Sequence, residues 1–274
     1  MDETRTPTEE NPPASAPTPT VGAPVPDPTG PAAEPSGPIP SPWTAAAGVV
    51  ASPTPAFAAM RGAKWHFALW PMALLGILGG LASFTFLSRV DMESFVRDQL
   101  QRSRFASQMS AEQMDKALES AKDVNPYTRA LWSLPASAIL LLLASLVYWV
   151  GFLALGRALS YSQTLIVVSW AQVPKAIQAV LACIILAVKD PSSVDPMNPV
   201  LSNAGAILGQ DALAGWQYAL LSSLDLFALW TAVLCILGFA AAGKMRRSQA
   251  ATVVIAVFAA KVLLWTAWAF FFQT

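Results

Sequence analysis

Five long apolar stretches dominate the chain from residue 67 onward and constrain its fold more than any other feature. A helix of about 20 apolar residues crosses the roughly 30 Å hydrocarbon core of a bilayer. It also satisfies its own backbone hydrogen bonds where no water is available. A soluble protein can bury one such helix, but hardly five in succession. The sequence therefore predicts an all-α, polytopic membrane protein whose five-helix transmembrane bundle has spans at about 67–88, 133–156, 163–188, 217–242 and 250–272.

The first sixty residues have a different composition. Fifteen of the 22 prolines lie there, mixed with Ala, Thr, Ser and Gly. Such a segment cannot bury enough apolar surface to offset the entropy of ordering it. We therefore assign residues 1–60 to a disordered Pro/Ala-rich tail and residues 61–274 to the transmembrane domain. Trp43, with the weakly apolar Ala45–Ala51 after it, is the one stretch of the tail that we expect to order on binding.

The connection at 89–132 is polar and predicts two short amphipathic helices. The first covers Asp91–Phe105, with its apolar residues roughly on one side. Ser110 followed by Gln113 is typical of a capping box, which begins a second helix that runs to about Lys122. Charge-balanced amphipathic helices of this kind lie on the membrane plane or cover the end of a bundle.

Three ionisable residues inside the spans form a candidate intramembrane polar cluster: Lys175, Asp225 and Lys261. An unpaired charge at mid-membrane costs about 3 kcal/mol on insertion scales, so these groups should face the bundle interior or a wet cavity. Three interpretations follow: a salt bridge between Asp225 and a lysine, a gate or ion path, or snorkelling of the lysines to the headgroups. Pro174, near the centre of the third span, should kink that helix around Ser169–Ala171.

The familiar enzyme sites are excluded by composition. A single histidine, His66, rules out a two-histidine zinc site. The chain has no Gly-x-Ser-x-Gly element and no Gly-rich phosphate loop. We therefore expect no catalytic residue, no metal site and no cofactor. The formal net charge of zero gives no basic field for nucleic acid.

Orientation follows from the positive charge of short loops. The cluster at Lys244–Arg247 is the clearest signal and should face the cytoplasm. Counting back through the spans places the N-terminus in the cytoplasm and the C-terminus outside, with the bacterial inner membrane as the expected location. The connection at 89–132 conflicts in part, because its seven Lys and Arg would lie outside beside seven acidic residues.

Three stretches of the chain resemble the Yip-domain family of five-span membrane proteins, in its bacterial form. One is VVSWAQVPKAIQAVLA (Val167–Ala182), with its central proline. Another is the Asn198-Pro199 element before the fourth span. The third is LLSSLDLFALWTAVLCILGF (Leu220–Phe239), in which Leu-Asp-Leu-Phe leads into a glycine-containing helix. The resemblance covers about residues 65–272 and leaves out the tail.

The resemblance implies an integral membrane protein but not a particular chemistry. In eukaryotic members the family name implies binding of Rab-type GTPases, but this chain lacks the Tyr-Pro and Gly-Thr-Pro elements of that branch, so GTPase binding is not transferable. We expect a non-enzymatic role in membrane organisation or partner binding. The alternatives are a small transporter or channel subunit that uses the kinked third span, and an adaptor that binds a protein partner through its tail while the bundle only anchors it in the bilayer.

Overall fold

A computed structural model describes residues 38–101, 109–157, 159–190, 194–195 and 198–272, and every regular element within these ranges is a helix. All of them fall in one compact unit, residues 34–274. The all-α prediction is therefore confirmed. Residues 1–37 lie outside the described part of the chain, as does Phe105 in the predicted amphipathic connection.

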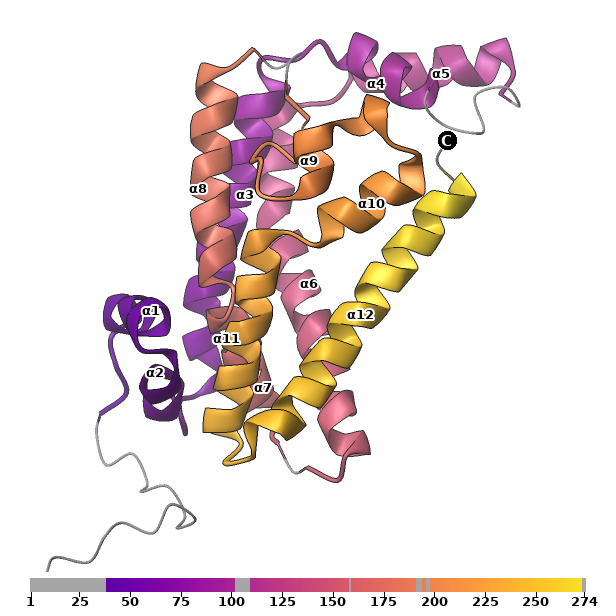
Figure 1. Cartoon of the computed structure of the whole chain (residues 1–274). Coiled ribbons are helices and arrows are strands. Elements are labelled where there is room, and N and C mark those ends of the chain that lie inside the picture. Colours follow the sequence, from indigo (N-terminus) through magenta and orange to yellow (C-terminus); the bar gives the residue numbers. More distant parts are fainter. Residues whose placement is uncertain (1–37, 102–108, 158, 191–193, 196–197, 273–274) are drawn as a thin grey trace, which may run out of the picture. The chain divides into compact units, whose positions relative to one another are not determined.

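Four helical segments are long and apolar enough to cross a membrane (Figure 1). They are Trp65–Leu87, in which the 3₁₀ turn η1 (Trp65–Ala68) leads into α3 (Leu69–Leu87); α6 (Pro126–Ala154); α7 (Tyr161–Trp170) with α8 (Val173–Val188); and α12 (Arg247–Phe272). The predicted fourth span is not continuous. It consists of α10 (Gly215–Ser223) and α11 (Leu226–Ala242), bent by 46° at a short break. The described residues thus hold four candidate spans, or five if the bent pair counts as one.

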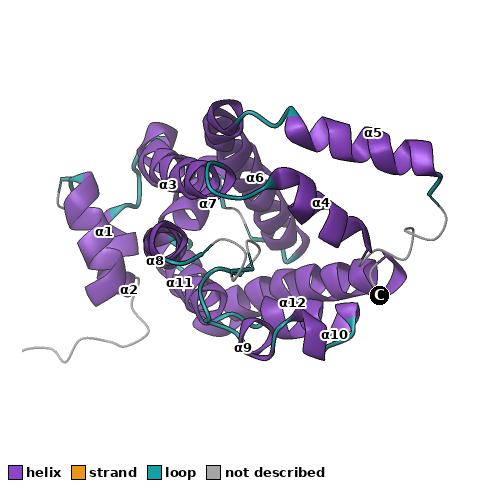
Figure 2. Ribbon diagram, turned by 90° about the horizontal axis from the view of Figure 1, so that it is seen from above, coloured by secondary structure: helices purple, strands orange, loops and turns teal. Residues whose placement is uncertain are grey.

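Close packing of α3 against α6 depends on glycine. A Cβ at Gly76 would lie 2.8 Å from Ser137 Oγ and 2.9 Å from the Cα of Leu134, and one at Gly80 would lie 2.7 Å from the Ala130 carbonyl oxygen. Ser133 Oγ donates to the Gly76 carbonyl at 2.6 Å. Small residues and interhelical hydrogen bonds are what bring helices together in lipid, where apolar burial gives little driving force. On its other side α3 packs along α8 (Figure 2).

The principal core lies between α6, α7 and α11. Phe239 on α11 is completely buried, with its ring centroid 4.6 Å from that of Phe152 and 5.4 Å from that of Tyr148, both on α6. On α7 the whole run from Thr164 to Trp170 is buried, which explains why this half of the third span shows no amphipathic pattern.

The boundary of the tail differs from the prediction. Residues assigned to the tail form α1 (Pro42–Ala51) and α2 (Pro53–Ala59), and α2 packs against α11. Val49 and Phe57 are fully buried, and a Cβ at Gly238 would lie only 3.2 Å from the Phe57 ring. Proline was counted here as a mark of disorder, but in both helices it occupies the first turn, where it needs no hydrogen-bond donor.

The polar connection forms α4 (Met92–Gln101) and α5 (Ala111–Lys122). The capping box at Ser110 and Gln113 is confirmed, and α5 ends at Lys122 as predicted. Glu93 on α4 pairs with Lys122 on α5 at 3.1 Å and with Arg97 at 3.1 Å. The next span begins earlier than predicted, because Asn125 caps α6 and the helix takes in residues 126–132.

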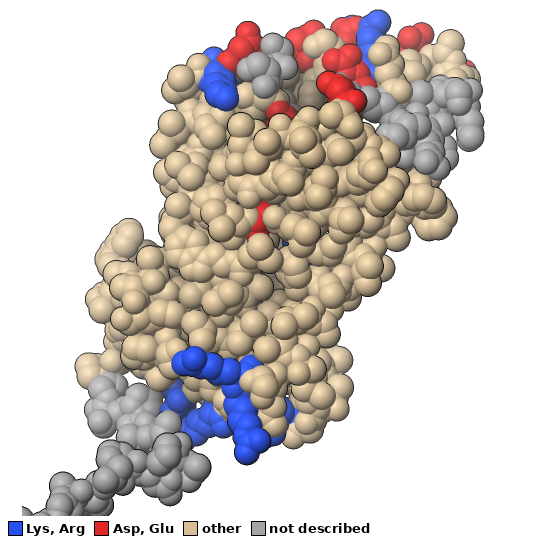
Figure 3. Space-filling model, viewed as in Figure 1, with Lys and Arg blue, Asp and Glu red and all other residues tan. Residues whose placement is uncertain are grey.

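Charges separate to opposite ends of the helices, with an apolar band between them (Figure 3). We call one end the acidic end; it comprises α4, α5 and the described residues of 189–211. The other, the basic end, carries six cations and, in the described part of the chain, no carboxylate. Its cations are Arg61, Lys64, Arg157, Lys244, Arg246 and Arg247.

Candidate functional site

Asp225 stands at the break in the fourth span and begins α11. Its backbone is extended (φ −84°, ψ 139°), and its Oδ1 accepts from the amides of Phe227 at 3.0 Å and Ala228 at 3.1 Å. These amides belong to the first turn of a helix, where they have no partner within it. A carboxylate at that position also meets the positive end of the helix dipole. Asp225 therefore acts first as an N-cap.

Two side chains from α8 complete one side of this carboxylate. Lys175 Nζ lies 3.2 Å from Asp225 Oδ1, and Gln178 Nε2 donates to Oδ2 at 3.1 Å. Lys175 also donates to Gln178 Oε1 at 2.8 Å, so the three groups form a closed set. Of the two charged side chains, Asp225 is 7% exposed and Lys175 is 32% exposed.

Pro174 determines where α8 begins. The hydrogen-bonded path of α7 ends at Trp170, and α8 resumes at Val173, with Pro174 in its first turn. The break at Ala171 and Gln172 overlaps the segment Ser169–Ala171, around which we predicted the kink. It starts α8 just before Lys175 and Gln178, which project toward Asp225 from its first two turns.

The loop before α9 (Ala204–Leu208) supplies the other side. Ser202 Oγ donates to Asp225 Oδ2, and Asn203 Nδ2 lies 3.5 Å from the same oxygen. The Ser202 carbonyl also accepts from the Leu226 amide at 3.1 Å. Asn203 is itself the N-cap of α9, through the Ala206 amide at 2.7 Å. The carboxylate thus joins the starts of two helices to α8.

From Asn203 a chain of hydrogen bonds continues toward the acidic end. Asn203 donates to Asn198 Oδ1 at 3.1 Å, and Asn198 donates to the Tyr218 hydroxyl at 2.6 Å. That hydroxyl donates to Asp195, which also accepts from Gln210 at 3.4 Å. We call the connected residues the Asp225 network. Its members are Lys175, Gln178, Asp195, Asn198, Ser202, Asn203, Gln210, Tyr218 and Asp225.

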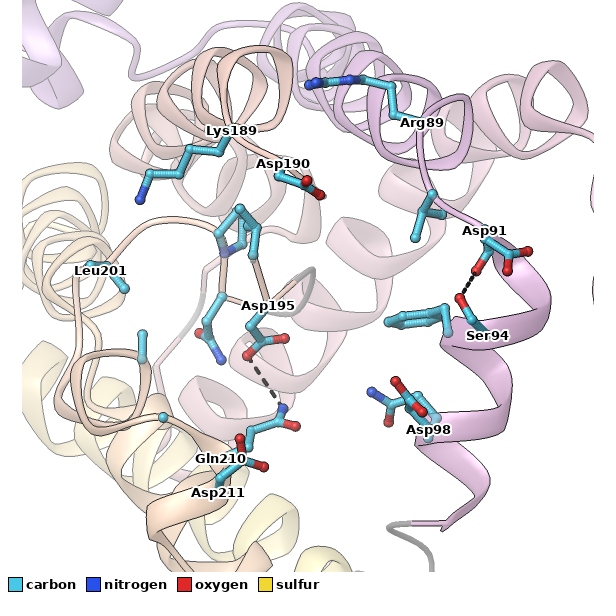
Figure 4. Close-up of a pocket in the computed structure, with 18 residues that line it drawn as sticks. Arg89, Asp91, Ser94, Asp98, Lys189, Asp190, Asp195, Leu201, Gln210 and Asp211 are labelled. Atoms are coloured by element: carbon cyan, nitrogen blue, oxygen red, sulfur yellow. Dashed lines mark hydrogen bonds between the residues drawn. The ribbon is translucent and has the colours of Figure 1, made fainter. Parts of the chain in front are cut away.

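The network ends at a cavity of about 600 Å³ between α4 and the 189–211 segment (Figure 4). Asp195, Asn198 and Gln210 belong to both the network and the cavity wall. Asp98 lies on the α4 side of the cavity, Asp91 directly precedes α4, and Arg89 and Lys189 lie at the rim (Figure 4). Arg89 is held by the Leu186 carbonyl at the end of α8. No cluster of potential metal ligands occurs in the described residues.

Lys261 is the third predicted member of the polar cluster. It lies on α12 and interacts electrostatically with both Asp225 and Lys175. It makes no ion pair with Asp225 within the described ranges, and its residue is exposed on the surface of the helices. The structure therefore joins Lys175 and Asp225 directly and leaves Lys261 as a neighbouring charge.

The three stretches that suggested the Yip-domain family meet in the Asp225 network. Lys175 and Gln178 come from the third-span stretch, Asn198 from the Asn-Pro element, and Asp225 from the Leu-Asp-Leu-Phe stretch. A family model, the Yip1 domain, matches residues 47–269. The chain belongs to the Yip1 domain family. Comparison with curated proteins and with solved structures finds no match. The Yip1 match begins inside α1, in agreement with the packing of the α1–α2 pair on the bundle.

Sequence reasoning did not identify Ser202, Asn203 and Tyr218 as site residues. Ser and Asn are the residues that most often cap helices, so Ser202-Asn203 before an apolar run carried a signal for a helix start. Tyr218 carried no such signal, because its role depends on the loop that folds over it.

Proposed function

We propose that this Yip1-domain protein has a non-enzymatic role in membrane organisation, exerted by binding a partner at the acidic end. The observation that carries the proposal is that the Asp225 carboxylate already accepts hydrogen bonds on both of its oxygens. Its two oxygens accept from Lys175, Gln178, Ser202 and two helix amides. Little of the hydrogen-bonding capacity of such a carboxylate is left for a substrate, so its role is structural. We call Asp225 and these hydrogen bonds the latch, because they fasten the 198–203 loop and the start of α11 to α8.

The latch supports partner binding because it holds the loop that lines the cavity. Ser202 and Asn203 connect Asp225 to Asn198, and Asn198 leads to Asp195 on the cavity wall. The opposite wall is α4, which is fixed to the bundle by the contact of Phe95 with Phe86, centroids 5.5 Å apart. A preformed surface of this kind binds without first having to order its loops.

Photocrosslinking in native membranes tests the proposal. A crosslinker at Gln99 or Leu201, on the cavity wall, should capture a protein that one at the lipid-facing Leu140 of α6 does not. The captured protein, once purified, should bind the intact chain directly. It should bind the Asp225→Asn chain about tenfold more weakly, the factor that corresponds to 1.4 kcal/mol. Equal binding to both chains would remove the latch from the proposal.

A second candidate function is a proton or cation path, and one specific observation favours it. Transporters place ionised groups at the breaks of discontinuous spans near the bilayer midplane. Here Lys175 follows the break in the third span, and Asp225 stands at the break in the fourth. The network then runs from these groups to the acidic cavity. Proton or potassium flux into liposomes that carry the purified chain, lost in Asp225→Asn, would make this the primary function.

For the topology, we propose a five-span, bacterial-type member in the inner membrane, in which α10 and α11 together form one crossing. The separation of charge supports a cytoplasmic basic end, with the N-terminus on the same side and the C-terminus outside. In a chain with both cysteines replaced by alanine, an impermeant thiol reagent added outside cells should label Glu112→Cys and not Arg246→Cys. The reverse pattern would overturn the orientation.

A further inference from the structure

The basic end is the other strongly charged surface of the molecule. Its cations come from three separate connections. They precede η1, join α6 to α7, and join α11 to α12. Basic side chains gather there (Figure 3), and no described residue of this end carries a carboxylate. At the acidic end, by contrast, Arg97 and Lys122 both pair with Glu93.

The depth of these cations is fixed by aromatic side chains. Trp65, directly after Lys64 in η1, and Trp70, in the first turn of α3, are 58% and 56% exposed. Exposed tryptophans at the start of a span settle at the headgroup level of a bilayer. The basic loop at 244–247 is equally close to hydrocarbon, because α11 ends at Ala242 and α12 begins at Arg247. The cations therefore lie at the level of lipid phosphates.

Arg61 is a partly buried member of this set of cations, and its contacts among the described residues include no carboxylate. Its Nη2 donates to the carbonyl of Ala241 at the end of α11. Its Nε and Nη1 are buried and have no hydrogen-bond partner among the described residues. The guanidinium thus ties the α2–η1 connection to α11, and none of the described carboxylates pairs with it. The N-termini of α7 and α12 face the same end and add to the field.

We propose that the basic end is a binding surface for the phosphate groups of anionic phospholipids. Lys64, Arg246 and Arg247, which are exposed, supply the contacts, and Arg61 and the helix N-termini supply the background field. Basic residues beside a span attract anionic headgroups and lose this attraction beyond a Debye length, so a surface at phosphate depth is the effective geometry. The proposal goes beyond the proposed function because it concerns the opposite end and needs no protein partner.

Lipid retention tests the proposal. The delipidated full chain, in a neutral detergent, is mixed with equal amounts of phosphatidylglycerol and phosphatidylcholine, and the lipid that stays bound through gel filtration is measured. The intact chain should retain phosphatidylglycerol in excess. In the triple variant Lys64→Gln, Arg246→Gln, Arg247→Gln, the ratio of retained phosphatidylglycerol to phosphatidylcholine should fall about tenfold. The control Arg97→Gln, Lys116→Gln, Lys122→Gln removes the same charge at the acidic end and should keep the preference.

Two further measurements decide cases in which the triple variant folds poorly. The preference of the unmodified chain should vanish at 1 M salt, where screening acts over about 3 Å. Inorganic phosphate at millimolar concentration should not displace the lipid, since a free ion lacks the acyl chains that hold the headgroup at this depth. Displacement by phosphate would replace the lipid by a free anion as the ligand. Equal retention by both triple variants, or a preference that survives high salt, would overturn the proposal.

Discussion

The third and fourth spans are both interrupted near their middle, but only the fourth is strongly bent. In the third, Ala171 and Gln172 keep nearly helical dihedral angles (φ −66°, ψ −11° and φ −80°, ψ 2°), so α7 and α8 form one span. In the fourth, Leu224 and Asp225 leave the helical region (ψ 54° and 139°), and the axis turns by 46°. The span with the proline stays together, and the span without one is broken.

The difference shows what bends a membrane helix here. Pro174 removes one backbone donor. Just before it, the chain makes a tighter turn, in which the Gln172 amide donates to the Ser169 carbonyl three residues earlier, at 3.2 Å. At the other break, Asp225 caps a new helix and the Ser202 carbonyl takes the Leu226 amide. The bend therefore occurs where the first amides of α11 find replacement acceptors, two of them at the Asp225 carboxylate and one at the Ser202 carbonyl. Four predictions test this comparison.

The largest effect should come from the ion pair. Asp225→Asn keeps a capping side chain but leaves Lys175 without its counter-charge, and Lys175→Met does the reverse. Removing one partner of a buried pair costs about 3 kcal/mol or more of unfolding free energy. The double variant should be more stable than the sum of the single losses predicts, by about 1–3 kcal/mol. Denaturation in detergent measures all three.

The matched control for this cycle is the more exposed pair Glu93–Lys122, with side chains 34% and 60% exposed, where Glu93→Gln and Lys122→Met should change stability by about 1 kcal/mol or less. Lys261→Met, combined with Asp225→Asn, tests the neighbouring charge and should show weaker coupling than Lys175→Met. Strict additivity of the Asp225 and Lys175 changes would mean that the carboxylate acts as a cap alone.

The second largest loss of stability is expected where α9 packs closely against α10. A Cβ at Gly205 would clash with Ser222 Oγ and lie 2.9 Å from the Ser222 amide nitrogen. Gly205→Ala should therefore destabilise the chain by about 1–3 kcal/mol, as overpacking does. Gly79→Ala is the control, because no atom lies within 4 Å of its Cβ position, and it should be neutral or stabilising by up to about 1 kcal/mol. Equal stability of the two variants would show that the loop is not held against α10.

Much of this arrangement could be predicted from sequence, for physical reasons that differ by region. The spans are predictable because the thickness of the hydrocarbon core sets the length of the apolar stretch that crosses it. The Ser110 capping box is predictable because it depends only on residues close together in sequence. The pairing of Asp225 with a lysine was predicted from the cost of isolated charge, and the structure shows the bond to Lys175. Lys261 could not be ranked against Lys175, since the lateral position of a helix is not readable from its own residues.

The sequence-based predictions that were wrong concern residue types that serve two purposes. Asp225 was interpreted as a charge within a continuous helix, although aspartate is also one of the best N-caps. The same ambiguity hid α1 and α2, whose prolines can mark either disorder or a first helical turn. In both places contacts distant in sequence decide the outcome, namely Ser202 for Asp225 and Gly238 for Phe57.

A smaller effect is expected at Ser202. Its hydroxyl donates to Asp225, and Ser202→Ala would remove that bond without disturbing the backbone carbonyl that takes the Leu226 amide. Hydrogen bonds to charged groups contribute about 1.5–3 kcal/mol, and the lower value applies because Gln178 still donates to the same oxygen. Ser94→Ala, which removes only a local bond to the Asp91 carbonyl, is the control. Amide exchange at the start of α11 should rise in Ser202→Ala and stay unchanged in Ser94→Ala.

The smallest effect should come from Pro174, the residue that sequence alone marks as the origin of a kink. Inside a helix a proline costs about 3 kcal/mol, but Pro174 lies in the first turn of α8, where a missing donor matters little. Pro174→Ala should therefore change the unfolding free energy by less than about 1 kcal/mol, well below Asp225→Asn in the same assay. The ion pair should survive, so Lys175→Met should lower stability equally with or without the proline. A larger loss of unfolding free energy in Pro174→Ala than in Asp225→Asn would contradict this view. The proline, and not the carboxylate network, would then be what holds the two interrupted spans in register.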